Sequence, residues 1–145
     1  MAHPSLKKIK ASIPHRNSML LVDEIVEQDD QSIVCRKRFL PEEHFFDGHY
    51  PGNPIVPGVI LCESAVQSGA ILLAETIANE DDKVPVLTRM SDVKFKSMVK
   101  PGDEIENSVK IDEVVSTAYY MTAQIRCQGK LVGRLSFTCS MAPAG

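Results

Sequence analysis

The stretch 48-GHYPGNPIVPG-58 runs directly into 59-VILCESAVQSGAILLAETIAN-79, and these two segments decide the fold. Three prolines and three glycines among eleven residues exclude a regular element in the first segment and fix a rigid backbone path. The second segment has no proline and is apolar around most of its circumference, which is typical of a buried helix. We therefore expect a rigid loop leading into one long central helix over 59–79, which begins next to Pro57.

The segments on either side of this helix are predicted to be extended. Strands are expected over 19–25, 32–40, 84–99, 104–115, 119–127 and 131–141, and 128–130 is a hairpin signal. Residues 41–57 form a long ordered loop, and loops of that length are usually functional. Two strands, one helix and four further strands predict one α+β domain over 1–145, with an antiparallel sheet wrapped around the helix. One sheet does not cover a helix that is apolar on several faces, so we also expect a homodimer.

The composition narrows the class of protein. With 43% hydrophobic and 24% charged residues, the 145-residue chain has the composition of an ordinary globular domain. A net charge of −3 argues against a nucleic-acid-binding surface. Residues 1–13 carry no apolar stretch of a secretory signal, and no membrane span is evident, so we expect a cytoplasmic protein without membrane insertion. No C-x-x-C pair occurs, which favours reduced, packed thiols at Cys35, Cys62, Cys127 and Cys139.

Two side chains near the start of the helix are suited to acid–base chemistry. His49 lies in the rigid loop, and histidine is the side chain best suited to proton transfer near neutral pH. Glu63 lies five residues after Gly58 in an apolar helix, where burial would favour its protonated form and suit it to act as an acid. Gln67 follows four residues later on the same helical face, in a position to orient Glu63 by a hydrogen bond.

The start of the helix adds a third component. Free backbone N–H groups at Gly58 and Val59, together with the helix dipole, can stabilise the negative charge that develops when a thioester carbonyl becomes an enolate. A base, an acid and an oxyanion site suit abstraction of a proton next to a carbonyl followed by loss of a β-hydroxyl. The residues alone leave a plainer alternative open, in which His49 bonds to loop backbone and Glu63 is an ion-pair partner in the core.

The same segment resembles a known family. The sequence from Gly48 to Gln67 is similar to the signature G-H-F-P-G-x-P-x-x-P-G-V, with Glu four residues on and Gln four after that, of FabZ-type 3-hydroxyacyl-[acyl-carrier-protein] dehydratases. The resemblance covers nearly the whole chain, because flanking blocks match in order. These blocks are 13-IPHR-16, 20-LLVD-23, 93-VKFK-96, 101-PGD-103 and 129-GKLV-132.

The resemblance implies a hot-dog fold and dehydration of 3-hydroxyacyl chains on acyl carrier protein in fatty acid biosynthesis, without a cofactor or metal. It implies that His49 removes the α-proton and that Glu63 of the other protomer protonates the departing hydroxyl. The Gly58 amide region would hold the thioester oxygen. It also implies homodimers, often arranged as trimers of dimers. Glu at position 63 favours plain dehydration, because the related enzymes that also isomerise the double bond carry Asp there.

The chain departs from the family pattern at two places. Tyr50 replaces the usual Phe, and Asn17, Ser18 and Met19 replace Tyr-Pro-Phe. Neither change removes a reacting group, and we expect both to bear on the acyl tunnel and its chain-length preference. Outside the signature, His15 is interpreted as structural, and the spacing of His44, Asp47 and His49 does not match an established metal-binding pattern.

Basic residues gather in one later region of the chain, at Arg89, Lys94, Lys96 and Lys100. They form either a solvated face or a docking surface for acidic acyl carrier protein, which Arg36 and Arg38 could extend. Two other functions are compatible with a hot-dog domain: an acyl thioesterase and a non-catalytic acyl-thioester-binding module. An assay for free thiol release separates the thioesterase from the dehydratase.

Overall fold

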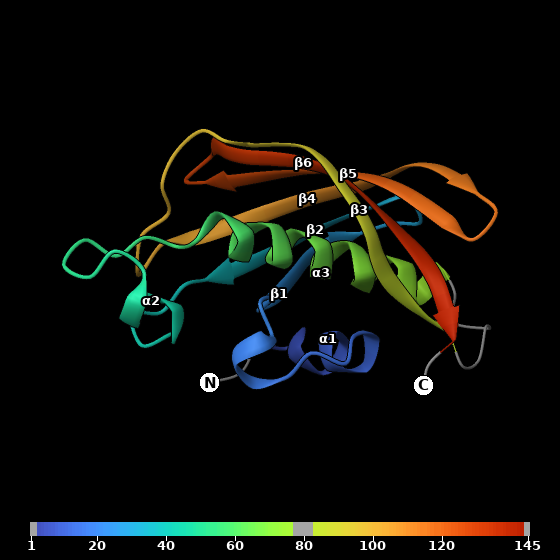
Figure 1. The fold of residues 1–145 in the computed structure, drawn as a ribbon. Coiled ribbons are helices and arrows are strands. Elements are labelled where there is room, and N and C mark those ends of the chain that lie inside the picture. The colour runs from blue at the N-terminus through green and yellow to red at the C-terminus, as the bar shows by residue number, and fades with distance from the viewer. Residues whose placement is uncertain (1–2, 77–82, 144–145) are drawn as a thin grey trace.

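The computed structural model describes residues 3–76 and 83–143 (Figure 1). Its helices are α1 (Leu6–Ser12), α2 (Phe45–Gly48) and α3 (Gly58–Thr76), with a short 3-10 helix η1 (Asn17–Met19). Its strands are β1 (Glu24–Gln28), β2 (Ser32–Arg38), β3 (Lys83–Phe95), β4 (Glu104–Val115), β5 (Ala118–Cys127) and β6 (Lys130–Pro143).

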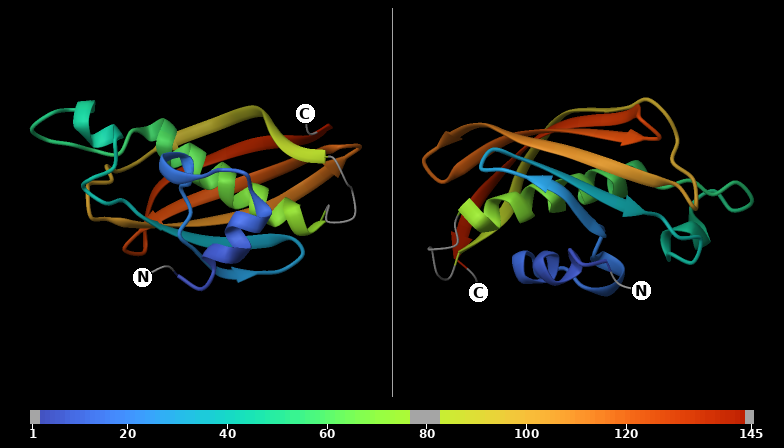
Figure 2. Two further views of the ribbon diagram at one scale, coloured as in Figure 1. Left: turned by 90° about the horizontal axis from the view of Figure 1, so that it is seen from below. Right: turned by 180° about the vertical axis from the view of Figure 1, so that it is seen from behind.

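The strands form one six-stranded sheet that curves over α3. The strand order is β1-β2-β4-β5-β6-β3, every adjacent pair is antiparallel, and β1 and β3 are the edges. Helix α3 lies along one face of this sheet, and α1 packs on the side of α3 that faces away from it (Figures 1 and 2). This is the α+β hot-dog fold predicted from the sequence.

Helix α3 is the centre of the core. Twelve of its residues, between Leu61 and Leu73, are buried against the inner faces of the strands. By length and composition alone α3 would pass as a membrane span, but two-thirds of it (67%) is buried inside the protein. That burial identifies it as a core helix. It begins at Gly58, one residue before the predicted start, and the predicted end at 77–79 lies outside the described residues.

The later strands agree closely with the prediction. Strand β4 has the predicted bounds, β5 begins one residue early and ends as predicted, and β6 begins one residue early and ends two residues late. The hairpin between β5 and β6 turns at Gln128 and Gly129, whose φ angles of 53° and 79° are both positive. Two positive φ angles are those of a type I′ turn, which matches the twist of the flanking strands.

The prediction of a strand over 19–25 was wrong for residues 19–23, because side chains of α3 bond to the backbone groups that a strand would need. Gln67 Nε2 donates to the Met19 carbonyl (2.7 Å), and Gln67 Oε1 accepts from the Leu21 N–H (2.8 Å). Ser64 Oγ donates to the Leu21 carbonyl (2.7 Å). Residues 17–19 therefore form η1, and the strand begins only at Glu24.

Helix α1 was not predicted. Its sequence carries a weak helical signal, because Leu6, Ile9 and Ile13 follow one another at helical spacing. Ile9 is fully buried, and Ile13 just after the helix is nearly so. The three surrounding lysines weaken the hydrophobic pattern that would predict a helix here. A helix with so narrow an apolar stripe is stable only when it packs against α3.

Candidate active site

The loop that carries His49 is held firmly at both ends. At its start, Lys37 Nζ lies 2.8 Å from Glu43, whose other carboxylate oxygen accepts the N–H of Leu40 (2.8 Å). In its middle the short helix α2 buries Phe46. At its end the Val56 N–H donates to the Val99 carbonyl (2.7 Å). These anchors give the loop the ordered path that its prolines and glycines predict.

The His49 ring is oriented by the loop itself. His49 Nδ1 lies 2.9 Å from the carbonyl oxygen of Ile55. Since a carbonyl oxygen can only accept a hydrogen bond, Nδ1 carries a proton and donates it, and in the neutral ring Nε2 therefore keeps a free lone pair. The ring also packs edge-on against Tyr50, at 4.8 Å between centroids. His49 is thus held in the tautomer that a general base requires.

Glu63 lies in the second turn of α3 with one of its oxygens well bonded. Its Oε2 accepts a hydrogen bond from Gln67 Nε2 (2.8 Å), as the spacing of four residues predicts, and lies 3.5 Å from His15 Nε2. The Glu63 side chain is 30% exposed in the single chain, so it is less buried than its apolar helix suggests. Burial raises the pKa of the nearby Cys139 thiol to about 12, and the charge of Glu63 adds to that rise.

The first turn of α3 presents free backbone donors. The N–H groups of Ile60 and Leu61 bond to the Pro57 carbonyl (2.9 and 3.2 Å). Among the described residues, no acceptor contacts the N–H of Gly58 or Val59. Val59 is largely exposed, and Gly58 faces the ring of Phe95. The two donors are therefore available to an oxygen atom of a ligand at the helix start.

Gly58 is required by close packing. A Cβ atom there would lie 2.7 Å from Phe95 Cε2, closer than real contacts allow. We expect Gly58→Ala to displace the ring and lower the free energy of unfolding by about 1–2 kcal/mol. Urea unfolding measures the change. Gly48→Ala, where a Cβ would meet no atom within 4 Å, is the matched control. The explanation is wrong if adding Phe95→Leu to the Gly58→Ala chain recovers none of the loss.

Within one chain, His49 and Glu63 bond to different partners. His49 bonds to the Ile55 carbonyl, whereas Glu63 bonds to Gln67 and His15. Across residues 3–76 and 83–143, no hydrogen bond or ion pair joins the two groups. A reaction that uses both therefore needs either a substrate between them or a second copy of the chain.

Edge strand β3 offers a surface for a second copy. It pairs with β6 on one side only, so its other edge has backbone groups without a strand partner in the described chain. Several large apolar side chains in this region are exposed, among them Val86, Leu87, Met90, Val93 and Phe95 on the strand and Met98 after it. An exposed apolar edge strand is favourable for pairing with another chain and unfavourable in water.

An apolar groove reaches the neighbourhood of Glu63. It has a volume of about 510 Å³ and is lined by residues 11–15, by Ala70 and Ala74 of α3, and by residues 83–87. His15 belongs to its wall and also contacts Glu63, so one residue links the groove to the carboxylate. The small side chains of Ala70 and Ala74 leave space along α3 for an extended apolar ligand.

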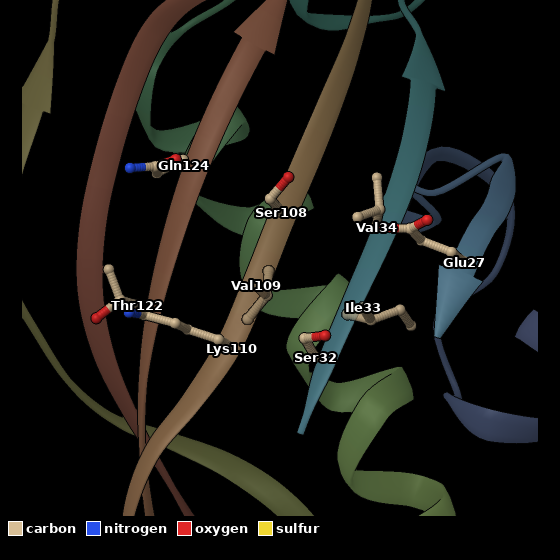
Figure 3. A pocket seen from close by; sticks show the side chains of 9 residues that line it. All are labelled: Glu27, Ser32, Ile33, Val34, Ser108, Val109, Lys110, Thr122 and Gln124. Atoms are coloured by element: carbon tan, nitrogen blue, oxygen red, sulfur yellow. The ribbon is translucent and has the colours of Figure 1, made fainter. Parts of the chain in front are cut away.

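A second hollow lies on the opposite side of the sheet. It measures about 370 Å³ and is lined by residues of β1, β2, β4 and β5, such as Glu27, Ser108 and Lys110. Figure 3 shows these side chains on the strands, with α3 behind the sheet. Neither His49 nor Glu63 belongs to its wall, so this hollow is not part of the candidate active site.

The basic residues divide between two parts of the sheet. Arg89, Lys94, Lys96 and Lys100 are all exposed on or just after β3. Arg36 and Arg38 lie on β2, separated from β3 by three strands, and they pair with carboxylates of Glu24, Glu104 and Glu106. Strand order thus separates Arg36 from the exposed residues of β3, whereas Arg38 donates to the Gly102 carbonyl (2.7 Å), in the turn that follows Lys100. The Asp23 carboxylate accepts the Arg38 N–H (2.7 Å).

Two further expectations concern metals and thiols. In the part of the chain that the structure describes, no group of three His, Cys, Asp or Glu side chains could hold a metal ion. The ring of His44 packs instead on Phe45, at 5.3 Å between centroids. All four cysteines are free thiols, and three are buried as predicted for small apolar side chains.

Comparison with known proteins assigns the sequence to a family. Residues 13–137 match the FabA-like domain. The chain is 36% identical over 137 residues to the 3-hydroxyacyl-[acyl-carrier-protein] dehydratase FabZ of Fusobacterium nucleatum, which covers 93% of this chain and 95% of the relative. A FabZ of Streptococcus pyogenes is 35% identical over 136 residues, with 92% and 97% covered.

Solved structures with the same fold include different activities. A chain of the dehydratase heterocomplex ApeI:P from Xenorhabdus doucetiae superposes with a TM-score of 0.80 at 14% identity, covering 92% of this chain and 90% of that one. A hypothetical thioesterase with coenzyme A from Streptococcus pneumoniae superposes with a TM-score of 0.63 at 20% identity, covering 83% and 86%. The fold alone therefore does not choose between dehydratase and thioesterase, whereas the sequence family does.

Proposed function

The chain belongs to the family of FabZ-type 3-hydroxyacyl-[acyl-carrier-protein] dehydratases, which are hydro-lyases of fatty acid biosynthesis, and we propose that His49 and Glu63 carry out its reaction. The substrate is a (3R)-3-hydroxyacyl chain on acyl carrier protein, and the product is the trans-2-enoyl thioester. The observation that carries this proposal is the bond between His49 Nδ1 and the Ile55 carbonyl, because it leaves Nε2 as a free base.

Proton abstraction comes first in the proposed reaction. His49 Nε2 takes the α-proton, and the electron pair of that C–H bond moves toward the thioester carbonyl. The N–H groups of Gly58 and Val59, which have no acceptor among the described residues, stabilise the developing negative charge on the thioester oxygen. The positive end of the α3 dipole lies at the same place and acts in the same direction.

Loss of the hydroxyl group completes the reaction. Protonated Glu63 donates its proton to the 3-hydroxyl, the C–O bond breaks, and water leaves as the C2=C3 double bond forms. Gln67 is almost fully buried, and its hydrogen bonds to Met19, Leu21 and Glu63 fix the carboxyl group in one orientation. Exchange with solvent then returns a proton to Glu63 and removes one from His49.

The proposed site is shared between two chains. The free apolar edge of β3 and the separate bonding of His49 and Glu63 within one chain both support a homodimer in which Glu63 of the partner subunit faces His49. Such dimers are also proposed to assemble in threes, as the resemblance implies. The groove beside Glu63, along Ala70 and Ala74, is proposed to receive the acyl chain.

The exposed basic residues near β3 are proposed to attract acyl carrier protein, since complementary charge mainly raises the rate of association. Arg89, Lys94, Lys96 and Lys100 are the candidates. We further propose that the protein works in the cytoplasm, where reducing conditions suit its four free thiols.

A direct assay tests the proposed function. We expect the protein to convert 3-hydroxyacyl chains of several lengths on acyl carrier protein to trans-2-enoyl thioesters, without release of free thiol. Mass spectrometry of the carrier protein measures loss of water, and a thiol reagent measures hydrolysis. Thiol release without enoyl product would indicate a thioesterase. Binding of the acyl carrier protein without either product would indicate a binding module.

A further inference from the structure

His15 contacts the proposed acid, although its sequence context suggested only a structural role. Its Nε2 lies 3.5 Å from Glu63 Oε2, and the two side chains are 29% and 30% exposed. Hydrogen bonds of catalytic groups are often long in structures without substrate and shorten when it binds. His15 also forms part of the wall of the acyl groove, so it lies between that groove and Glu63.

The surroundings of the His15 ring select one tautomer. Its Nδ1 is buried and has no hydrogen-bond partner among the described residues. Nδ1 lacks a partner in either tautomer, so the other ring nitrogen decides between them. Nε2 faces Oε2 of Glu63, and a carboxylate oxygen can only accept, so the tautomer with its proton on Nε2 directs an N–H group at Glu63.

The two donors near Glu63 lie against the same carboxylate oxygen. Gln67 Nε2 and His15 Nε2 both lie against Oε2, and no described residue bonds to Oε1. When the carboxyl group is protonated, an oxygen that faces two N–H donors is favoured as the carbonyl oxygen. The acidic proton is then on Oε1, the oxygen that is left free for the substrate hydroxyl.

The backbone of His15 is fixed independently of Glu63. The Arg16 guanidinium donates to the carbonyls of Lys10, Ile13 and His15 at 2.7–2.8 Å. Gln67 holds the other end of this segment at Met19 and Leu21. A backbone held on both sides of His15 restricts where its ring can lie before substrate binds, which is the arrangement expected of a positioning group.

We propose that His15 is a positioning residue of the dehydratase, which together with Gln67 holds Oε2 of Glu63 so that Oε1 carries the proton given to the leaving hydroxyl. The proposal rests on the proposed function, because it assigns Glu63 as the acid. Two titratable groups of the described chain interact with Glu63: His15 by contact and Cys139 by charge. Burial raises the pKa of Cys139 to about 12, so its thiol keeps its proton over the pH range of an assay.

Two substitutions at His15 separate positioning from packing. His15→Leu keeps bulk but removes the N–H donor, whereas the amide of His15→Gln places a donor near the position of Nε2. We expect His15→Leu to lower kcat about tenfold with little change in KM, because a hydrogen bond to a chargeable group is lost. His15→Gln should recover most of the loss.

The pH profile of kcat/KM separates positioning from packing, because a loss of packing alone would not shift the profile. A donor to Oε2 favours the carboxylate form, so its removal makes the protonated form more stable. The limb of the bell-shaped kcat/KM profile that reports ionisation of Glu63 should therefore move to higher pH in His15→Leu and stay in place in His15→Gln. His3→Leu is the matched control, because His3 also pairs with a glutamate (Glu24, 2.7 Å) but at the far end of α1.

The proposal is overturned if His15→Leu has a normal kcat and an unchanged pH profile of kcat/KM. It is also overturned if kcat falls equally in both His15 variants while the pH profile stays in place, because loss of packing alone would give that result. Ring ¹⁵N NMR tests the geometry without relying on activity. We expect His15 to carry its proton on Nε2, and Glu63→Gln to shift that N–H signal. A proton found mainly on Nδ1 would contradict the proposal even in an active enzyme. Absence of dehydration in the wild type would instead contradict the proposed function.

Discussion

Removing either proposed reacting group should abolish dehydration while leaving the fold intact. We expect His49→Ala and Glu63→Ala each to lower kcat by about 10²–10⁴-fold, the usual cost of losing one general acid or base. His49 lies in a loop, and Glu63 is partly exposed, so neither side chain is a large part of the core. Enoyl formation under saturating substrate measures the loss, and thermal unfolding checks that the chain remains folded.

Matched residues nearby distinguish a specific role from a general disturbance. His44→Ala changes an exposed histidine in the same loop, and Glu75→Ala changes an exposed glutamate on the same helix, where its pair with Lys8 is a surface contact. Both variants should keep near-normal turnover. If His49→Ala also kept it, the assignment of the base would be wrong, and the same holds for Glu63→Ala and the acid.

Two inactive chains should restore activity to each other when they exchange subunits. In a hybrid of His49→Ala and Glu63→Ala chains, one composite site lacks both groups and the other has both intact. Random pairing of equal amounts makes half of the dimers hybrid, and each hybrid has one working site of two. The recovered activity should therefore approach about a quarter of the wild-type value, because a site fails when either group is lost.

A second mixture shows whether the recovered activity comes from hybrid sites. His49→Ala combined with a His49→Ala, Glu63→Ala double variant forms hybrids with no intact site and should stay inactive. Native mass spectrometry of differently tagged chains verifies exchange. If exchange is complete and the first mixture stays inactive, each site takes both groups from one chain, and the shared site proposed from the β3 edge is wrong.

Local sequence determined much of this protein. Proline, glycine and apolar spacing predict the loop, the start of α3 and its burial, because these depend on neighbours along the chain. The β5–β6 hairpin follows from residues at its turn, where Gly129 accepts a positive φ readily. The spacing of Glu63 and Gln67 predicts their hydrogen bond, since residues four apart share one helical face.

Contacts between distant segments decided the rest. Residues 19–23 have the apolar character of a strand, but the buried side chains of Gln67 and Ser64, more than forty residues away, take up their backbone groups. Nothing adjacent to His15 indicates that it reaches Glu63, because the distance depends on how the N-terminal segment packs on α3. Non-local pairing also decides the surroundings of the arginines on β2: strand order separates Arg36 from β3, whereas a contact with Gly102, 64 residues later, brings Arg38 beside the turn after Lys100.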